Sequence, residues 1–155
     1  MKTLIVVPVR MGSSRFPGKP LTIINGSPML EHVVNNARNS SKASEVVVAS
    51  CDEEIANYCR ELEVSFVMTS ALHTRATERT HEAVSILESK GSVFDLVLML
   101  QGDEPCITGS MIDEQIRACE LNPDWQVTNL LGRITSREEH EDPNTIKVVS
   151  DLAGK

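Results

Sequence analysis

Positively charged residues that could bind a polyphosphate gather in one short stretch near the start of the chain. Residues 8–19 contain Arg10, Arg15 and Lys19 among glycine and serine residues. Glycine and serine allow a backbone to approach a ligand closely and to present N–H groups to it. Arginine offers paired donors to phosphate oxygens, and lysine offers a point charge. We therefore predict a phosphate-binding loop, with contacts from Arg10, Gly12, Ser13, Ser14, Arg15, Gly18 and Lys19.

The spacing within this stretch excludes two common phosphate-binding motifs. The Walker pattern Gly-x4-Gly-Lys-Ser/Thr is missing, and Gly12 and Gly18 lie too far apart for the dinucleotide pattern Gly-x-Gly-x-x-Gly. A polar surface loop with scattered charges is the alternative. Because the chain has a net charge of −7 and its cations concentrate here, we favour a ligand-binding loop.

A second candidate for chemistry is Asp103, within Gln-Gly-Asp-Glu-Pro at residues 101–105. It follows the apolar run 94–100, and open α/β sheets bind ligands beyond the carboxyl ends of their strands. A carboxylate there suits Mg²⁺, which binds to one or two carboxylates together with phosphate oxygens. The alternative is a turn aspartate that bonds to its own backbone. The strand and the glycine alone do not separate these two interpretations.

A third polar stretch, residues 73–79, reads His-Thr-Arg-Ala-Thr-Glu-Arg and leads into a helical pattern. Thr77 is a plausible helix N-cap. A solvated loop is the ordinary interpretation of such a stretch. His32 and His81 lie inside helical patterns and are expected to be structural or exposed.

The elements that must position these residues alternate along the chain. Short apolar runs predict strands at residues 4–7, 45–50, 64–68 and 94–100, with a short extended piece at 21–24. The mixed stretch 125–134 and residues 146–150 are also predicted to be strands. Apolar residues at helical spacing predict helices at residues 29–38, 53–63, 78–90 and 111–121, with a short charged helix or turn at 136–141. The predicted N-caps are Ser27, Asp52, Thr77, and Thr108 or Gly109.

This alternation predicts an α/β fold of three layers, with a mostly parallel sheet and helices on both faces. The 155 residues form one domain in this prediction. The acidic composition argues against nucleic-acid and anionic-membrane partners. No apolar run reaches the length of a membrane span, and four cysteines without metal spacing fit reduced thiols, so we expect a cytoplasmic protein.

Residues 8–21, Pro-Val-Arg-Met-Gly-Ser-Ser-Arg-Phe-Pro-Gly-Lys-Pro-Leu, resemble the N-terminal loop of the sugar nucleotidyltransferases. The resemblance is strongest to the 3-deoxy-manno-octulosonate (Kdo) cytidylyltransferases, with the acylneuraminate cytidylyltransferases as cousins. In that family the loop wraps the triphosphate of CTP, which implies that Pro8 also contacts the nucleotide. The resemblance implies the nucleotide-diphospho-sugar transferase fold.

Later motifs extend the resemblance. Gln-Gly-Asp-Glu-Pro matches a family motif whose Asp binds magnesium, so Gln101 and Asp103 become candidate ligand-binding residues and Asp103 the Mg²⁺ ligand. The family pattern His-x-Ser-Gly-Thr-Glu/Asp-Arg lies over the nucleotide and sugar, which makes Thr77 a candidate contact. Arg75 and Ala76 stand where the family has Ser and Gly. Asn144 and Lys147 match a further motif, Pro-Asn-x-Val-Lys-Val-Val.

The resemblance implies transfer of CMP from CTP to an acidic sugar with release of pyrophosphate, with Arg10, Lys19 and Asp103 as catalytic residues and Mg²⁺ as cofactor. An acylneuraminate-type or other sugar nucleotidyltransferase, and a nucleotide-binding remnant without catalysis, are the alternatives. A Rossmann dehydrogenase lacks its glycine fingerprint here. Family members are longer, so we expect a C-terminally incomplete sheet, a missing second metal ligand, and a homodimer in the full-length form.

Overall fold

A computed structural model of the chain describes residues 1–12 and 16–149. The chain falls into two units by internal contacts, Met1–Pro123 and Asp124–Lys155, which are described separately. One domain over residues 1–155 therefore stays a prediction. Three predicted loop residues, Ser13, Ser14 and Arg15, lie outside the described part of the chain.

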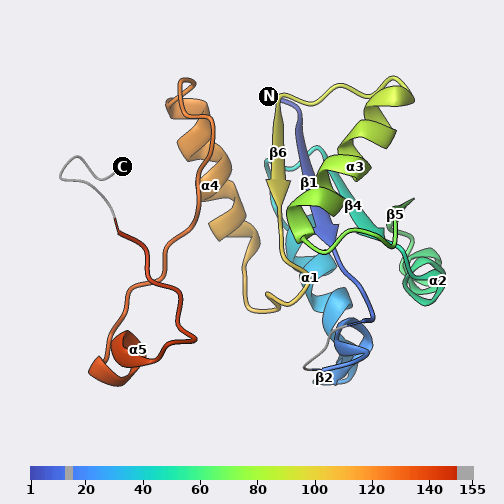
Figure 1. Cartoon of the computed structure of the whole chain (residues 1–155). Coiled ribbons are helices and arrows are strands. Elements are labelled where there is room, and N and C mark those ends of the chain that lie inside the picture. The colour runs from blue at the N-terminus through green and yellow to red at the C-terminus, as the bar shows by residue number, and fades with distance from the viewer. Residues whose placement is uncertain (13–15, 150–155) are drawn as a thin grey trace. The chain divides into compact units, whose positions relative to one another are not determined.

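The first unit is built on a parallel four-stranded sheet with the strand order β5-β4-β1-β6 (Figure 1). Its strands are β1 (Thr3–Pro8), β4 (Glu45–Ser50), β5 (Ser65–Met68) and β6 (Leu96–Met99). A separate antiparallel hairpin pairs β2 (Ile23–Ile24) with β3 (Ser27–Pro28). The four predicted strands of this unit are confirmed, and their parallel pairing agrees with the strand–helix alternation.

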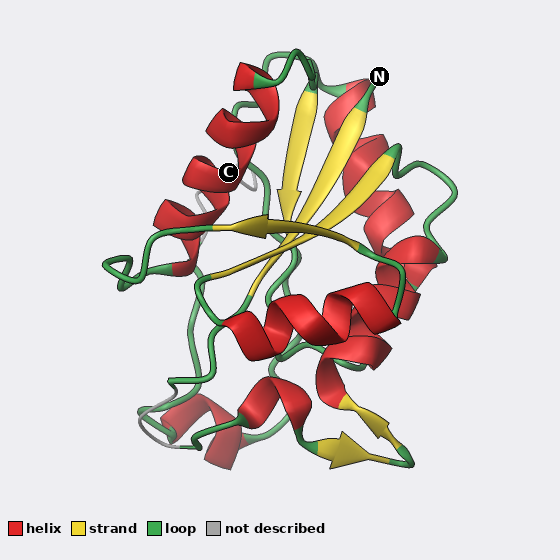
Figure 2. Ribbon diagram, turned by 90° about the vertical axis from the view of Figure 1, so that its right-hand side faces the viewer, coloured by secondary structure: helices red, strands yellow, loops and turns green. Residues whose placement is uncertain are grey.

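Helices cover both faces of this sheet (Figure 2). The elements are the 3-10 helix η1 (Lys19–Leu21) and the α-helices α1 (Met29–Arg38), α2 (Glu53–Glu61), α3 (Ala76–Ser89) and α4 (Gly109–Leu121). Side chains of α1, α2 and α4 pack in one hydrophobic cluster, and those of α3 pack in another. The predicted three-layer α/β fold is therefore confirmed.

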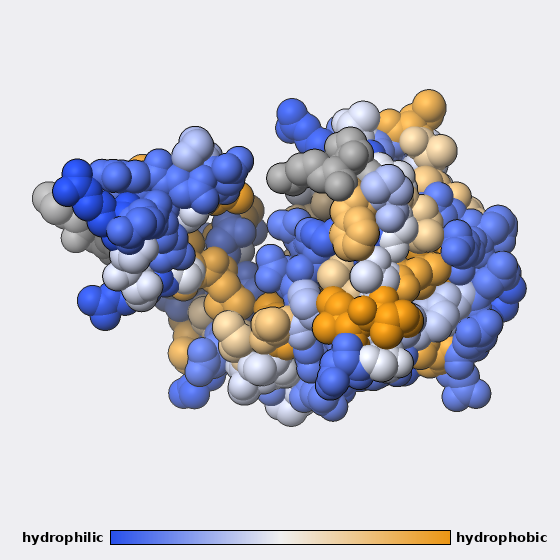
Figure 3. Space-filling view, turned by 90° about the horizontal axis from the view of Figure 1, so that it is seen from below, coloured by the Kyte–Doolittle hydropathy of each residue, from blue (hydrophilic) through white to orange (hydrophobic). Residues whose placement is uncertain are grey.

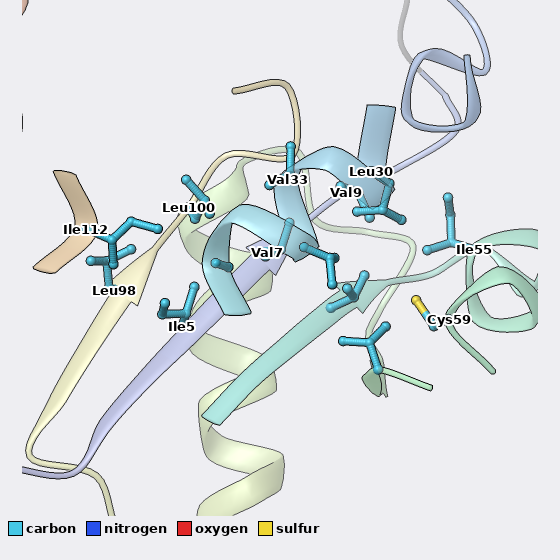
Figure 4. Close-up of a cluster of buried hydrophobic side chains, with 14 of the residues drawn as sticks. Ile5, Val7, Val9, Leu30, Val33, Ile55, Cys59, Leu98, Leu100 and Ile112 are labelled. Carbon is cyan, nitrogen blue, oxygen red and sulfur yellow. The ribbon is translucent and has the colours of Figure 1, made fainter. Parts of the chain in front are cut away.

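Strand β1 lies at the centre because both of its faces are apolar. Ile5 and Val7 belong to the cluster with α1, α2 and α4, whereas Leu4 and Val6 belong to the cluster with α3. All four side chains are fully buried. Figure 4 shows the first cluster, in which Leu30, Ile55 and Ile112 close over the sheet. A strand that is buried on both faces has a continuous run of apolar residues, so β1 could be predicted from the sequence.

Two predicted helix N-caps, Ser27 and Thr77, are wrong, whereas Asp52 and Thr108 are confirmed as N-cap residues. The hairpin turn at Asn25 and Gly26, both with positive φ, places Ser27 in β3, so Pro28 is the N-cap of α1. Helix α3 begins after Arg75 instead of Thr77 because the Glu78 carboxylate accepts the backbone N–H groups of Thr74 and Arg75, both at 3.1 Å. Asp52 is the N-cap residue of α2 but makes no side-chain bond to that helix.

The second unit contains one helix among its described residues, α5 (Arg137–Glu141), which confirms the predicted short helix. Ser136 caps it by accepting the N–H of Glu139 at 3.1 Å. The predicted strands at 125–134 and 146–150 are wrong over their described residues, which form no strand. Apolar side chains there are exposed, including Val127, Leu131 and Ile146. A strand needs a neighbouring backbone to pair with, and the described residues of this unit offer none.

No helix in the described ranges is long and apolar enough to cross a lipid bilayer.

Helix α4 is attached to the α1–β4 connection by Asp113. The Asp113 carboxylate accepts bonds from the hydroxyls of Ser40 and Ser41, at 2.5 and 2.6 Å, and from the backbone N–H groups of Ser41 and Lys42, both at 3.1 Å. These bonds, led by those from the two hydroxyls, lower the pKa of Asp113 to about 2. Because its pKa is lower in the folded state, the carboxylate stabilises the fold above its ordinary titration range and loses this contribution as pH falls towards 2.

We therefore predict that Asp113→Asn lowers the free energy of unfolding at pH 7 by about 1.5–3 kcal/mol, the range for bonds to a charged group. The gap between the variant and the parent chain should narrow as pH falls from 6 to 3, because Asp113 of the unfolded parent chain takes up a proton in this range, whereas asparagine does not titrate. Urea unfolding at several pH values measures the gap. A gap that stays constant over this range would contradict the assigned role of Asp113.

Candidate functional site

A cavity of about 630 Å³ lies where β1 and β6 end. These strands are neighbours in the sheet, so the residues that follow them meet at the same edge. The cavity is lined by Pro8, Val9, Arg10, Phe16, Lys19, Pro20, Met29, His73, Thr74, Arg75, Ala76, Arg79, Gln101, Gly102 and Asp103. All of these residues belong to the first unit, and they come from three loops and the starts of η1, α1 and α3. This edge of a parallel sheet is the usual ligand-binding position of α/β folds.

Lys19 and Asp103 meet in this cavity although 84 residues separate them in the sequence. Lys19 Nζ donates to Asp103 Oδ2 at 2.6 Å. Both side chains are partly exposed, at 35% and 42% of their full area. Exposed ion pairs contribute at most about 1 kcal/mol, so a ligand can replace this contact at little cost. The pair therefore places a cation next to a candidate metal-binding carboxylate, and their mutual attraction is weak enough for a ligand to separate them.

The cavity is lined by more positive than negative charge. The cations Arg10, Lys19, Arg75 and Arg79 face a single lining carboxylate, Asp103. The whole chain carries a net charge of −7. A local excess of cations in an acidic chain favours a small anionic ligand bound at this position.

Arg79 matches the last residue of the family motif at residues 73–79 but is not among the predicted site residues, and the structure places it in the cavity lining. It is only 3% exposed, and its guanidinium donates to the Thr69 hydroxyl. A buried guanidinium is costly unless it is paired, and no ion pair to Arg79 is found among the described residues. Its position four residues before the buried Ala83, on the sheet-facing side of α3, is the signal that could have identified it.

The loop before α3 is held in place by two carboxylates of that helix. Glu82 accepts the backbone N–H of Ser70 at 2.7 Å and lies 2.6 Å from His73 Nε2. The bond from Ser70, assisted by His73, lowers the pKa of Glu82. The backbone N–H groups of Arg75 and Thr74 likewise lower the pKa of Glu78. These bonds fix the stretch that carries His73, Thr74 and Arg75 against the cavity.

Gly102 is needed because the two strand ends approach closely. A Cβ at this position would lie 2.0 Å from Val9 Cγ1 and 3.4 Å from the carbonyl oxygen of Pro8. Gly102 therefore lacks a side chain because Pro8 and Val9, at the end of β1, pack directly against it. This contact sets the spacing between the loop that carries Arg10 and the loop that carries Asp103.

We predict that Gly102→Ala destabilises the fold by about 1–3 kcal/mol, the range for overpacking a closely packed site. For a chain of this size the melting temperature should fall by about 2–12 °C. Circular dichroism during heating measures this change. Gly132→Ala is the control, because a Cβ there would contact nothing within 4 Å, and an equal fall in both variants would contradict the close approach.

Of the eleven predicted site residues, eight lie in the described part of the chain, and the structure brings five of these together. Pro8, Arg10, Lys19, Gln101 and Asp103 line the cavity. Gly12, Gly18 and Thr77 are not among its lining residues, although Gly18 closes the loop by donating its N–H to the carbonyl of Met11 at 3.0 Å. Ser13, Ser14 and Arg15 are not described. The roles of all these residues stay predictions.

The donor set of the cavity suits Mg²⁺ only when phosphate oxygens share the ion. Asp103 is the one carboxylate among the lining residues, and no group of three or more His, Cys, Asp or Glu side chains in the described ranges could hold a metal. Mg²⁺ commonly binds to one or two carboxylates while phosphates and water complete its shell. Asp103 therefore fits a metal that arrives with a nucleotide, and does not fit a preformed protein cage.

The chain matches the sequence profile of the family described as "Cytidylyltransferase" over residues 4–155. It is 37% identical over 154 residues to a 3-deoxy-manno-octulosonate cytidylyltransferase of Geobacter metallireducens. The aligned region covers 99% of this chain and 59% of that protein. It is 38% identical to an 8-amino-3,8-dideoxy-manno-octulosonate cytidylyltransferase of Shewanella pealeana, over 97% of this chain and 61% of that protein. The chain thus spans about three fifths of the length of these curated relatives.

Solved structures give the same picture of the fold. A CMP:2-keto-3-deoxy-manno-octonic acid synthetase complexed with CTP superposes with a TM-score of 0.72 at 33% identity, over 79% of this chain and 49% of that chain. A 4-diphosphocytidyl-2C-methyl-D-erythritol synthase superposes with a TM-score of 0.66 at 18% identity, over 88% of this chain and 65% of that chain, which is a likeness of fold alone.

Proposed function

Because the chain belongs to the cytidylyltransferase family, we propose that it carries the nucleotide-binding half of an enzyme that transfers CMP from CTP to an acidic sugar and releases pyrophosphate. The observation that supports this most directly is the pairing of Lys19 with Asp103 in a cavity rich in arginine. A triphosphate needs several cations, and its metal needs a carboxylate. Both requirements meet at this one edge of the sheet.

The proposed reaction is an in-line substitution at the α-phosphorus of CTP. The oxygen of a sugar hydroxyl forms a bond to that phosphorus while the bond to the bridging oxygen breaks, and pyrophosphate leaves as the hydroxyl proton is released. Such transfers depend on positioning and on stabilisation of negative charge. Arg10 and Lys19 would bind the phosphates, and Asp103 would hold Mg²⁺, which supplies further positive charge when it is bound.

The acidic sugar proposed here is an octulosonate. The supporting observation is that the two curated relatives described above carry names of octulosonate cytidylyltransferases. The sugar carboxylate would add to the negative charge that the lining arginines attract. Arg75 and Ala76 line the cavity at positions where the family usually has Ser and Gly. Because this difference could change which sugar fits, other acidic sugars are also tested as substrates.

The test is a pyrophosphate-release assay with CTP, Mg²⁺ and a panel of acidic sugars, made on this chain and on a full-length relative. Release that depends on both CTP and an octulosonate would support the proposal, and a preference for a neuraminate would redirect it to that branch. Calorimetric binding of CTP without release would indicate a nucleotide-binding remnant. Absence of both CTP binding and release in this chain would reject the proposal.

A further inference from the structure

Asp52 occupies the first capping position of α2 but directs its carboxylate elsewhere. Its Oδ2 atom accepts the backbone N–H of Met11 at 2.8 Å and the hydroxyl of Ser50 at 3.2 Å, and no side-chain bond to α2 is present. Capping aspartates normally bond to the free N–H groups of their own helix. Asp52 therefore contributes to the loop after β1, 41 residues earlier in the sequence.

Met11 is the residue at which that loop is closed. Its N–H is bonded to Asp52, and its carbonyl accepts the N–H of Gly18 at 3.0 Å. On the preceding side, the N–H of Val9 donates to the carbonyl of Ala49 at 3.0 Å, which continues the pairing of β1 with β4. The backbone is thus fixed on both sides of Arg10 and immediately before Lys19. Each cation lies next to a residue with an anchored backbone N–H.

We propose that Asp52 is a positioning residue, which holds the base of the loop so that Arg10 and Lys19 face the cavity before a ligand arrives. This inference rests on the proposed function, because it takes CTP as the ligand. A charged acceptor forms stronger hydrogen bonds than a neutral one, so the carboxylate suits this task. A loop that is ordered in advance loses less conformational freedom on binding, and so binds more tightly.

A purely structural role for Asp52 makes a different prediction. In that case its loss would lower overall stability and affect nucleotide binding only through unfolding. Asp113 supplies the matched comparison, because its carboxylate also accepts backbone N–H groups, those of Ser41 and Lys42, and it does not line the cavity. Loss of Asp113 should weaken the fold and leave the loop after β1 unchanged.

The experiment compares Asp52→Ala, Asp52→Asn and Asp113→Ala with the parent chain, at a temperature where circular dichroism shows each of them folded. Amide hydrogen exchange of Met11 and Gly18, measured by NMR, reports on the loop without any ligand. Calorimetry with CTP and Mg²⁺ reports on affinity. If Asp113→Ala does not fold, Asp113→Asn takes its place.

Asp52→Ala should speed the exchange of the Met11 N–H at least about tenfold, as expected when a hydrogen bond to a charged acceptor is lost. The exchange of Val48 in β4 should not change equally. The affinity for CTP should fall about 5- to 20-fold, because the loop must then be ordered on binding. Asp52→Asn should recover much of both losses, since its amide oxygen can accept the same N–H. Asp113→Ala should keep both values within about twofold of the parent chain, since distant and independent sites act separately.

Unchanged exchange at Met11 in Asp52→Ala would overturn the inference, and so would equal losses of affinity in Asp52→Ala and Asp113→Ala. If the parent chain binds no CTP, the proposed function fails, and the exchange rates alone then decide whether Asp52 holds the loop.

Discussion

Replacement of Asp103 by asparagine is expected to lower the rate of pyrophosphate release from CTP by about 100- to 1,000-fold, the usual effect of removing one electrostatic contact to a transition state. The asparagine would keep the size of the side chain and lose the charge that, in the proposed function, would hold Mg²⁺ against the phosphates. The Asp103 side chain is 42% exposed and packs in no hydrophobic cluster, so the fold should be unaffected. The assay is single-turnover pyrophosphate release at saturating CTP.

Glu120→Gln is the matched control for this prediction. Glu120 forms an ion pair with Lys42 at 2.6 Å, the same distance as in the Lys19–Asp103 pair, and is similarly exposed at 34%. It does not line the cavity. A rate for Asp103→Asn within a few-fold of that for Glu120→Gln would show that the Asp103 carboxylate has no part in the reaction.

Replacement of Lys19 by methionine is expected to weaken CTP binding by about 10- to 100-fold, which corresponds to the loss of a hydrogen bond between two charged groups. Methionine keeps the length of the side chain and removes the charge that would contact the triphosphate. In the absence of nucleotide, the same variant should bind Mn²⁺ a few-fold more tightly, because Asp103 no longer has an ammonium partner worth up to about 1 kcal/mol. Calorimetry measures the first effect, and electron paramagnetic resonance of free Mn²⁺ measures the second.

Lys42→Met provides the comparison for Lys19→Met. Lys42 pairs with Glu120, is 33% exposed against 35% for Lys19, and lies outside the cavity. Both its CTP affinity and its Mn²⁺ affinity should equal those of the parent chain. Equal weakening of CTP binding in both variants would mean that only net charge matters, and would remove Lys19 from the proposed site.

The sequence predicted the core of the first unit because its strands are apolar on both faces. The run at Leu4–Val7 and the run that includes β6 could be identified by composition alone, since buried parallel strands lack alternation. Once the two runs are placed in one parallel sheet, Lys19 and Asp103 must follow strands that end at the same edge. Their meeting at 2.6 Å is therefore a consequence of topology that the sequence pattern could anticipate.

Features that depend on long-range contacts could not be predicted in this way. Asp52 matches the pattern of a helix cap, and only the fold shows that its carboxylate contacts Met11 instead. Arg79 lies one helical turn before Ala83, which indicates the sheet-facing side of the helix, but its position beside the cavity depends on how α3 packs on the sheet. The apolar residues at 125–134 fit a strand by composition, but pairing requires a partner that composition does not reveal.

Hydrophobic side chains also remain on the surface of the first unit. Ile23 and Ile24 of the β2–β3 hairpin are 62% and 39% exposed. Figure 3 views the molecule from the side on which β2 lies in Figure 1, and shows orange hydrophobic residues among mostly blue hydrophilic ones. Single exposed apolar residues are common in folded proteins, so these two residues need no functional explanation.

The most direct test of the central claim is a crystal structure of the chain with CTP and Mn²⁺, with the metal located by its anomalous scattering. The triphosphate should lie in the cavity against Arg10 and Lys19, with the metal bound to Asp103 and the Lys19–Asp103 contact broken. A triphosphate bound away from this cavity, or a metal bound elsewhere while Lys19 stays paired with Asp103, would contradict the claim.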